Sequence, residues 1–272
     1  MVGYLIVFVL GSILGSFLNV CIHRLPKAES VIWPSSHCPL CNQRIKPYDN
    51  IPFISYILLR GRCRFCKGKI SWRYPLVEFI TGFFFLLLFL RYGLSYDLFF
   101  YLILISALIV ASFIDIAERI IPDEISLGGM VLGFILNAVR GISLSPFHLN
   151  WKPALDSFLG IIVGGGVIFL TGWIFDFIYF RLLKRPPIQG ETESMGFGDV
   201  KLLAMIGAFL GWQKALFTFF VAPFFGVVVG LYLLLTKKEH TIPYGPFLSL
   251  GAVISLLYFT KIISSLFPYK IL

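Results

Sequence analysis

Two aspartates in this 272-residue chain stand where a carboxylate needs a special reason. Asp115 directly follows the uncharged, largely apolar stretch 102–114, which places it in the last turn of a predicted helix. The helix macrodipole disfavours an anion at that end, so neither capping nor solubility explains the residue. Asp199 lies in the segment 195–201, Met-Gly-Phe-Gly-Asp-Val-Lys, where another apolar stretch begins. Ionisable side chains at membrane depth are costly, so both positions indicate function.

A pair of carboxylates is suited to hydrolysing a peptide bond. Two carboxyl groups close together cannot both ionise easily, so one keeps a proton. The protonated group can polarise the scissile carbonyl while the anion activates water. The helix ends lead us to expect that Asp199 is the more acidic and that Asp115 carries the proton, although the titration belongs to the pair. We therefore predict an aspartyl peptidase with Asp115 and Asp199 as catalytic residues.

Asp199 and the glycines before it also have a structural explanation, unlike Asp115. Aspartate is a good N-cap residue, so Asp199 could simply open its helix, and Asp123 could cap the next predicted helix in the same way. Gly196 and Gly198 can take positive φ and allow another backbone to approach closely. A lone G-x-G-D segment is weak evidence because many tight turns have this pattern. It gains weight when a second acid lies on the same face.

Four cysteines form a second cluster of the pattern C-x-x-C repeated twice: Cys38, Cys41, Cys63 and Cys66. Two such pairs about 20 residues apart give four thiolates that can surround one tetrahedral metal ion. We predict a structural Zn²⁺ that stabilises a loop too small to build its own core and that has no catalytic role. Two disulfides are the weaker alternative in a reducing cytoplasm. His37 could replace one ligand but is expected at the surface, and Cys21 and His23 are expected to pack at the membrane interface.

The elements that must position these residues are predicted to be membrane-spanning helices. The chain is 58% hydrophobic and only 14% charged, with a mean hydropathy of +0.87, which excludes an ordinary soluble domain. The first stretch is expected to be retained, because it lacks a basic leading region and a small-residue cleavage site. We predict an all-α polytopic membrane protein of about eight spans, several near the roughly 20 residues that cross a bilayer. They lie at about 2–22, 75–91, 96–114, 124–143, 153–180, 199–212, 214–236 and 246–266.

Charge determines the predicted orientation. The loop 23–74 carries ten Lys and Arg residues against Glu29 and Asp49, so it is expected in the cytoplasm with the N-terminus outside. Alternation of the eight spans then places Asp115 and Asp199 together on the cytoplasmic side. The net charge of +9 is explained by the cytoplasmic loops, so no nucleic-acid partner is expected.

Three domains are predicted: a first span at 1–22, a cytoplasmic zinc-binding loop at 23–74 and a transmembrane aspartyl peptidase domain at 75–272. Two other classes of protein compete with this interpretation. A proton-coupled transporter would use the acids as a proton path, and a membrane scaffold would use the metal loop to organise partners. The transporter is disfavoured because the acids lie at one membrane edge and no paired broken helices are evident.

The chain resembles the type 4 prepilin peptidases, the GxGD-type leader peptidase/N-methyltransferases of bacterial inner membranes, almost from end to end. The loop between Pro26 and Cys38 is shorter than in many members, and Cys21 stands where an apolar residue is expected. The similar segments are 15–26 (GSFLNVCIHRLP), 38–41 (CPLC), 49–52 (DNIP), 55–56 (SY), 59–66 (LRGRCRFC), 70–78 (ISWRYPLVE), 115–123 (DIAERIIPD), 196–204 (GFGDVKLLA) and 242–247 (IPYGPF).

The resemblance implies that Asp115 and Asp199 are catalytic. It implies removal, at the cytoplasmic face, of the short basic leader of type IV prepilins and type II secretion pseudopilins, after a Gly. It also implies methylation of the new N-terminus with S-adenosylmethionine, associated with the loop 23–74; a peptidase without methyltransferase activity is the alternative. No glycine-rich dinucleotide-type loop follows a strand, so the cofactor site is not placed. Glu78 could position substrate or cofactor, or be anchored by Arg73.

Prepilin or pseudopilin substrates and the lipid bilayer are the expected partners. Both the leader and the cytoplasmic face of the chain are basic, so Coulomb attraction between them cannot recruit the substrate. We expect anionic lipid and the apolar segment of the substrate to do so. Lys201, two residues after Asp199, is expected either to lower the pKa of that acid or to extend towards the membrane interface.

Overall fold

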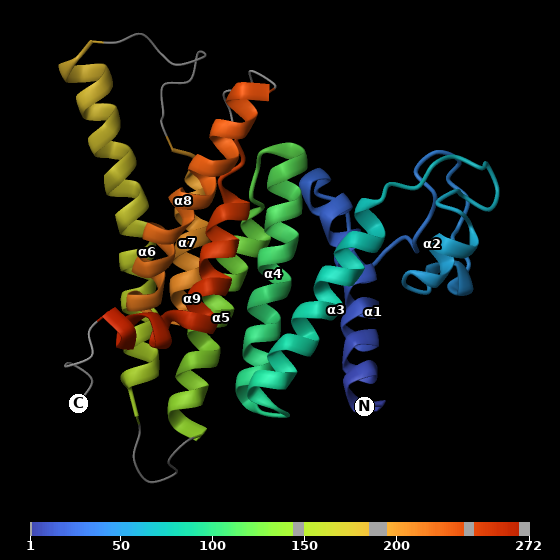
Figure 1. Ribbon diagram of the computed structural model, residues 1–272, viewed down its shortest axis with the longest axis horizontal. Coiled ribbons are helices and arrows are strands. Elements are labelled where there is room, and N and C mark those ends of the chain that lie inside the picture. The colour runs from blue at the N-terminus through green and yellow to red at the C-terminus, as the bar shows by residue number, and fades with distance from the viewer. Residues whose placement is uncertain (1, 144–149, 185–194, 237–241, 267–272) are drawn as a thin grey trace. The chain divides into compact units, whose positions relative to one another are not determined.

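The computed structural model describes all residues except 1, 144–149, 185–194, 237–241 and 267–272 (Figure 1). The regular secondary structure of the described residues is helical, with no strand, which confirms the predicted fold class. The chain divides into two compact units, Met1–Ile114 and Asp115–Leu272, and the boundary falls inside α4 (Tyr96–Glu118). The connections between the predicted spans 153–180 and 199–212 and between 214–236 and 246–266 lie partly outside the described residues.

In the first unit, α1 (Val2–Arg24) packs against α3 (Arg73–Tyr92). Small residues allow this close approach. A β-carbon at Gly15 of α1 would lie 2.7 Å from the Cα of Glu78, and one at Gly82 of α3 would lie 2.5 Å from the Ser12 Oγ. The end of α1 is therefore held directly against the start of α3.

The segment that connects these two helices carries the four cysteines. It contains only short helical turns among its irregular stretches: η1 (Leu25–Lys27), η2 (Pro47–Asn50) and α2 (Ile54–Leu58). Two isolated antiparallel bridges, His37 with Arg44 and Arg62 with Lys69, mark the two cysteine turns. Such a segment has little core of its own, so other interactions must hold its shape.

The second unit is organised around α7 (Phe197–Leu210), which contacts each of the other helices of its bundle. These helices are α5 (Asp123–Ser143), α6 (Lys152–Asp176, continued by the π-helical turn η3, Phe177–Leu182), α8 (Trp212–Thr236) and α9 (Gly245–Leu266). Every residue of α7 from Leu202 to Leu210 is buried, as expected for a helix that is apolar on all sides. A β-carbon at Gly160 of α6 would overlap the carbonyl oxygen of Gly207, so only glycines allow α6 and α7 to approach this closely.

Six of the described helices are long and apolar enough to cross a membrane: α1, α3, α4, α6, α8 and α9. Helices also occupy the two other predicted spans, but α5 carries Glu124, Asn137 and Arg140, and α7 has only 14 residues. At 1.5 Å per residue, α7 is about 21 Å long, less than the roughly 30 Å of hydrocarbon. The predicted count of about eight spans is therefore not confirmed. Outward apolar side chains on α8, such as Phe224 and Val228, fit contact with lipid.

Candidate active site and metal-binding loop

Asp115 lies in the last turn of α4, as predicted, and is only 6% exposed. Its Oδ2 accepts a hydrogen bond of 2.8 Å from the backbone N–H of Gly245, the first residue of α9. The C-terminus of α4 offers Asp115 neither free N–H groups nor a positive dipole end. The N-terminus of α9 supplies both. This hydrogen bond joins residues 130 positions apart, so local sequence patterns could not reveal it.

Glycine at position 245 leaves room for the Asp115 carboxylate, which would have to move if the residue carried a side chain. A β-carbon there would lie 2.8 Å from the Asp115 Oδ2, inside any normal carbon–oxygen contact. The residue therefore both donates to the carboxylate and leaves room for it. The segment 242–247 was recognised in the sequence as similar to the family, but its residues do not indicate that it contacts Asp115.

Asp199 lies in the first turn of α7 and is partly buried. The helix begins at Phe197 with Gly196 as its N-cap residue, so the alternative in which Asp199 is the N-cap is wrong. The charge of Asp115 acts on Asp199, so the two predicted acids lie within electrostatic range of each other. An acidic group in a first helical turn is favoured by the macrodipole, but that placement alone does not explain the proximity of a second acid.

The glycines before Asp199 do not have the positive φ that we expected. Gly196 has φ −67° and ψ 135°, which any residue can adopt, and Gly198 is not among the described glycines with positive φ. Gly198 instead provides space, because a β-carbon there would lie 3.2 Å from the Ile121 Cβ. Of the two roles expected for these glycines, Gly198 therefore fulfils the one of allowing a close approach. The neighbour is the Ile121 side chain rather than another backbone.

Two further residues belong to this site: Tyr244, to which the sequence assigned no role, and Lys201, which was expected to act on Asp199 or to extend towards the membrane interface but instead pairs with Asp123. Tyr244 is half-buried; burial and the negative charge of Asp199 raise its pKa to about 12. Lys201 pairs with Asp123 of α5, with 2.6 Å between Nζ and Oδ1, and thereby ties the start of α7 to the start of α5. Asp123 is the first residue of α5 rather than its cap.

The four cysteines meet as predicted. Their Sγ atoms all lie within 4.8 Å of one another, and the Cys38 and Cys66 sulfurs are 3.9 Å apart. Four thiolates at about 2.3 Å from a tetrahedral zinc ion would be about 3.8 Å apart, so these residues can hold such an ion. All five cysteines are free thiols, which excludes the two-disulfide alternative. Cys21 and His37 lie outside the cluster, and the His37 Nδ1 is 3.2 Å from the Ser35 carbonyl oxygen.

The two cysteine pairs adopt the same turn. The residue after the second cysteine of each pair has left-handed backbone geometry, with φ of 56° at Asn42 and 59° at Lys67. Cys38 and Cys63, which open the two turns, each donate a backbone hydrogen bond across the turn, to the carbonyl oxygens of Gln43 and Gly68. Hydrogen bonds from the backbone N–H groups of Cys66 and Phe65 lower the pKa of the Cys63 thiol to about 7. The Cys41 thiol has a backbone hydrogen bond with Gln43 that lowers its pKa, but burial and the neighbouring thiols raise that pKa overall to about 11. Of these two cysteines, Cys63 is the one favoured as the thiolate that binds metal.

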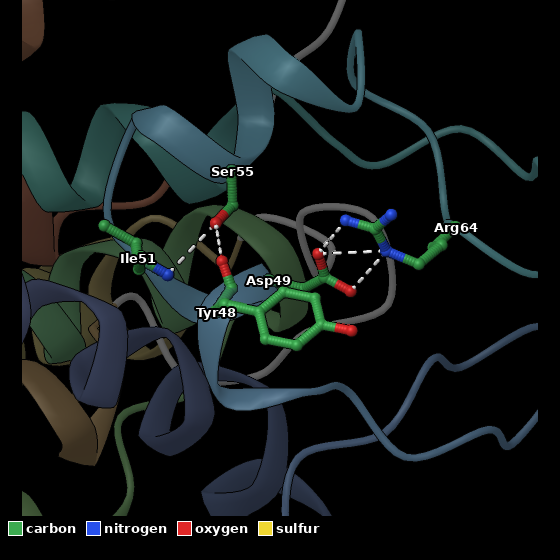
Figure 2. A network of polar contacts seen from close by, with 5 residues as sticks. All are labelled: Tyr48, Asp49, Ile51, Ser55 and Arg64. Carbon is green, nitrogen blue, oxygen red and sulfur yellow. Dashed lines mark hydrogen bonds and ion pairs between the residues drawn. The ribbon is translucent and has the colours of Figure 1, made fainter.

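A polar network fixes the second cysteine turn to the segment around η2 (Figure 2). The Arg64 Nε and Nη2 donate to both carboxylate oxygens of Asp49, at 2.6 to 3.1 Å, and the guanidinium lies 5.4 Å from the centre of the Tyr48 ring. Arg64 holds the pKa of Asp49 below its usual range. The Ser55 hydroxyl donates to the Tyr48 carbonyl oxygen at 2.8 Å and accepts from the Ile51 N–H at 3.1 Å.

These observations define a class: a polytopic α-helical membrane protein with two neighbouring buried or partly buried carboxylates and a four-cysteine metal-binding loop. Residues 9–92 match the Bacterial Peptidase A24 N-terminal domain, and residues 102–231 match the Type IV leader peptidase family. The chain belongs to the type IV leader peptidase family. The prepilin leader peptidase/N-methyltransferase of Pseudomonas putida is 34% identical, over 94% of this chain and 91% of that protein.

Two further relatives carry the same name. The protein of Pectobacterium carotovorum subsp. carotovorum is 36% identical over 92% of this chain and 91% of its own length. That of Pseudomonas aeruginosa is 32% identical over 92% of this chain and 88% of its own length. No solved structure matches the chain.

Proposed function

We propose that this protein removes the leader peptide of type IV prepilins or pseudopilins and methylates the new N-terminal amine. The observation that supports the peptidase half is that Asp115, held by the N-terminus of α9, acts electrostatically on Asp199. Membership of the family and relatives that are named for both activities support the pairing of the two reactions.

Asp115 and Asp199 form the catalytic pair of the proposed peptidase. The Gly245 N–H donates to Asp115 and so favours its ionised form, which leaves the shared proton on Asp199. This assignment is the reverse of the one we predicted from the helix ends alone. Asp115 accepts a proton from water as the water oxygen attacks the scissile carbonyl carbon, while Asp199 donates its proton to the carbonyl oxygen. When the tetrahedral intermediate collapses, the C–N bond breaks and the departing amine takes the proton from Asp115. A hydroxyl of the intermediate returns its proton to Asp199 as the carbonyl re-forms, which restores both acids to their starting states.

The methyl donor in this proposal is S-adenosylmethionine. It supplies a methyl group on a positively charged sulfur: the substrate amine forms the new N–C bond, the C–S bond electrons pass to sulfur, and the displaced amine proton goes to water. The four cysteines fit Zn²⁺ in a closed structural site, with Cys38, Cys41, Cys63 and Cys66 as its ligands. We assign the metal to the shape of the loop 23–74 and the peptidase to the helices of 75–272.

The proposed location is the bacterial inner membrane, with the N-terminus outside and the active site at the cytoplasmic face. The positive charge of the loop 23–74 supports this orientation. The proposed substrates reach the enzyme through the bilayer, since their apolar segment partitions into lipid while their basic leader is attracted to anionic headgroups.

Purified protein in detergent tests both halves of the proposal with one prepilin-like substrate. Asp115→Asn and Asp199→Asn should each lower leader cleavage by about 10³-fold or more, because each removes one partner of the acid–base pair. Labelled S-adenosylmethionine in the same reaction should transfer label to the product of the unmodified enzyme. Full cleavage by either variant would exclude the peptidase mechanism, and cleavage without any transfer would leave a peptidase alone.

A further inference from the structure

The first unit contains a cavity of about 500 Å³ that the peptidase mechanism does not use. Its walls come from the end of α1, the segment around η2 and α2, the cysteine turns and the start of α3, and all of its lining residues belong to Met1–Ile114. Sites for small molecules typically have volumes of roughly 300–1,000 Å³. The cavity is therefore large enough for a nucleoside-sized ligand.

One wall of the cavity carries a buried carboxylate. Glu78 of α3 lines the cavity, is 8% exposed, and accepts a hydrogen bond of 3.0 Å from the Phe53 N–H. The ion pairs described in this structure, Arg64 with Asp49 and Lys201 with Asp123, do not include it. A buried carboxylate without a cation is costly. This arrangement favours a ligand that brings positive charge.

Two more lining residues have buried polar atoms without a hydrogen-bond partner: the Oδ1 of Asn19 and the Nε of Arg73. Asn19 is 2% exposed, and its amide nitrogen donates to the carbonyl oxygens of Gly15 at 3.2 Å and Tyr74 at 3.1 Å. The side chain is therefore fixed in orientation while its oxygen remains unsatisfied. Native proteins rarely leave such atoms unpaired, and a bound ligand is one way to satisfy them.

The backbone at the cavity is strained at Phe53. This residue has φ 58° and ψ −50°, which is rare for an aromatic side chain. Its N–H is the donor to Glu78, so the unusual backbone serves the carboxylate directly. Strain of this kind is concentrated at binding and catalytic sites. Phe53 and Tyr74 also line the cavity and bring two aromatic side chains to its wall.

We propose that this cavity is the methyl-donor site, with Glu78 binding the positively charged part of S-adenosylmethionine and Arg73 binding its carboxylate. This inference rests on the methyltransferase half of the proposed function. The donor carries a carboxylate, an ammonium group and a sulfonium beside a nucleoside, so it needs acidic, basic and aromatic groups within one cavity. Glu78, Arg73, Phe53 and Tyr74 provide all three kinds. Cys38 and Cys63 also line this cavity, so the metal cluster shapes one wall of the proposed site.

The test measures binding rather than turnover. Full-length protein with its metal is reconstituted in lipid nanodiscs, and equilibrium dialysis with labelled S-adenosylmethionine gives the dissociation constant in the absence of pilin. Glu78→Gln removes the charge but keeps a carbonyl that can accept the Phe53 N–H, and should raise the constant at least tenfold. Glu29→Gln makes the same chemical change at an exposed residue that does not line the cavity, and should leave the constant unchanged.

A second measurement does not depend on the variant remaining folded. Ultraviolet cross-linking of labelled donor to the unmodified protein, followed by peptide mapping, should place the label in peptides from 16–24, 36–56 or 63–78. Label confined to Asp115–Leu272 would overturn the site, as would equal affinity in a Glu78→Gln protein with a full complement of metal. If the unmodified protein bound no donor at all, the proposed methyltransferase function itself would fail.

Discussion

At the scale of single residues, the hydrogen bond between Gly245 and Asp115 gives the sharpest prediction. Gly245→Ala places a methyl group 2.8 Å from the position of the Asp115 Oδ2. The carboxylate must move, and we expect leader cleavage to fall by about 10²-fold, comparable with loss of one aligned donor in an active site. Cleavage kinetics with a prepilin-like peptide measure this effect.

Gly128→Ala is the matched control for that variant. Gly128 lies in α5 of the same unit, and a β-carbon there meets nothing within 4 Å. We expect unchanged cleavage and equal or slightly higher stability, because alanine favours a helix interior over glycine. Equal activity of both variants would show that the Asp115 carboxylate tolerates displacement.

Tyr244 gives a prediction about pH. Its raised pKa, about 12, lies above the ordinary value for tyrosine, so the neutral form is favoured in the folded protein. The resulting stabilisation is fully present below about pH 10 and is lost as the pH rises through about 12. The hydroxyl is therefore a hydrogen-bond donor throughout any practical assay range. We expect Tyr244→Phe to lower the cleavage rate about tenfold at every pH from 6 to 9; a variant whose loss of rate varied across that range would contradict this.

At the scale of elements, the repeated cysteine turn leads to a prediction about stability. Lys67 holds left-handed geometry, with φ 59°, that costs an L-residue about 1 kcal/mol or more. Lys67→Gly should relieve this cost and slow the loss of metal to a chelator by several-fold. Lys46→Gly is the control, because Lys46 already has an ordinary backbone at φ −73° and should gain nothing. Faster loss of metal from Lys67→Gly would show that the turn depends on the lysine side chain.

Sequence patterns located elements well but not the contacts between them. In the part of the chain that the structure describes, each of the eight helices of 14 or more residues was predicted. The start of α7 was misplaced by only two residues, because apolar stretches are local signals. The four-cysteine cluster was predicted because the C-x-x-C spacing is also a local signal in the sequence. The Gly245 donor, the Lys201 pair with Asp123 and the burial of Glu78 were not predicted, because each depends on helices far apart in the chain.

At the scale of the whole molecule, the two proposed activities occupy different compact units. The cysteines and the cavity lie in Met1–Ile114, whereas Asp115, Asp199 and Gly245 lie in Asp115–Leu272. Removal of the metal with a chelator should therefore weaken donor binding at least tenfold while leader cleavage stays within about twofold, since ordering of the loop depends on its ligands. Dialysis and peptide kinetics on one preparation measure both. Equal loss of both activities would show that the metal loop also supports the peptidase.

The contact between Gly15 and the Glu78 backbone has a consequence for how such enzymes diversify. A β-carbon at position 15 would lie 2.7 Å from the Glu78 Cα, so Gly15→Ala would push the first turns of α3 away from α1. Glu78 would then leave its place in the cavity although no lining side chain had been altered. A single added methyl group could thus silence one chemistry and spare the other, which offers a short mutational route from a dual-purpose ancestor to a dedicated protease.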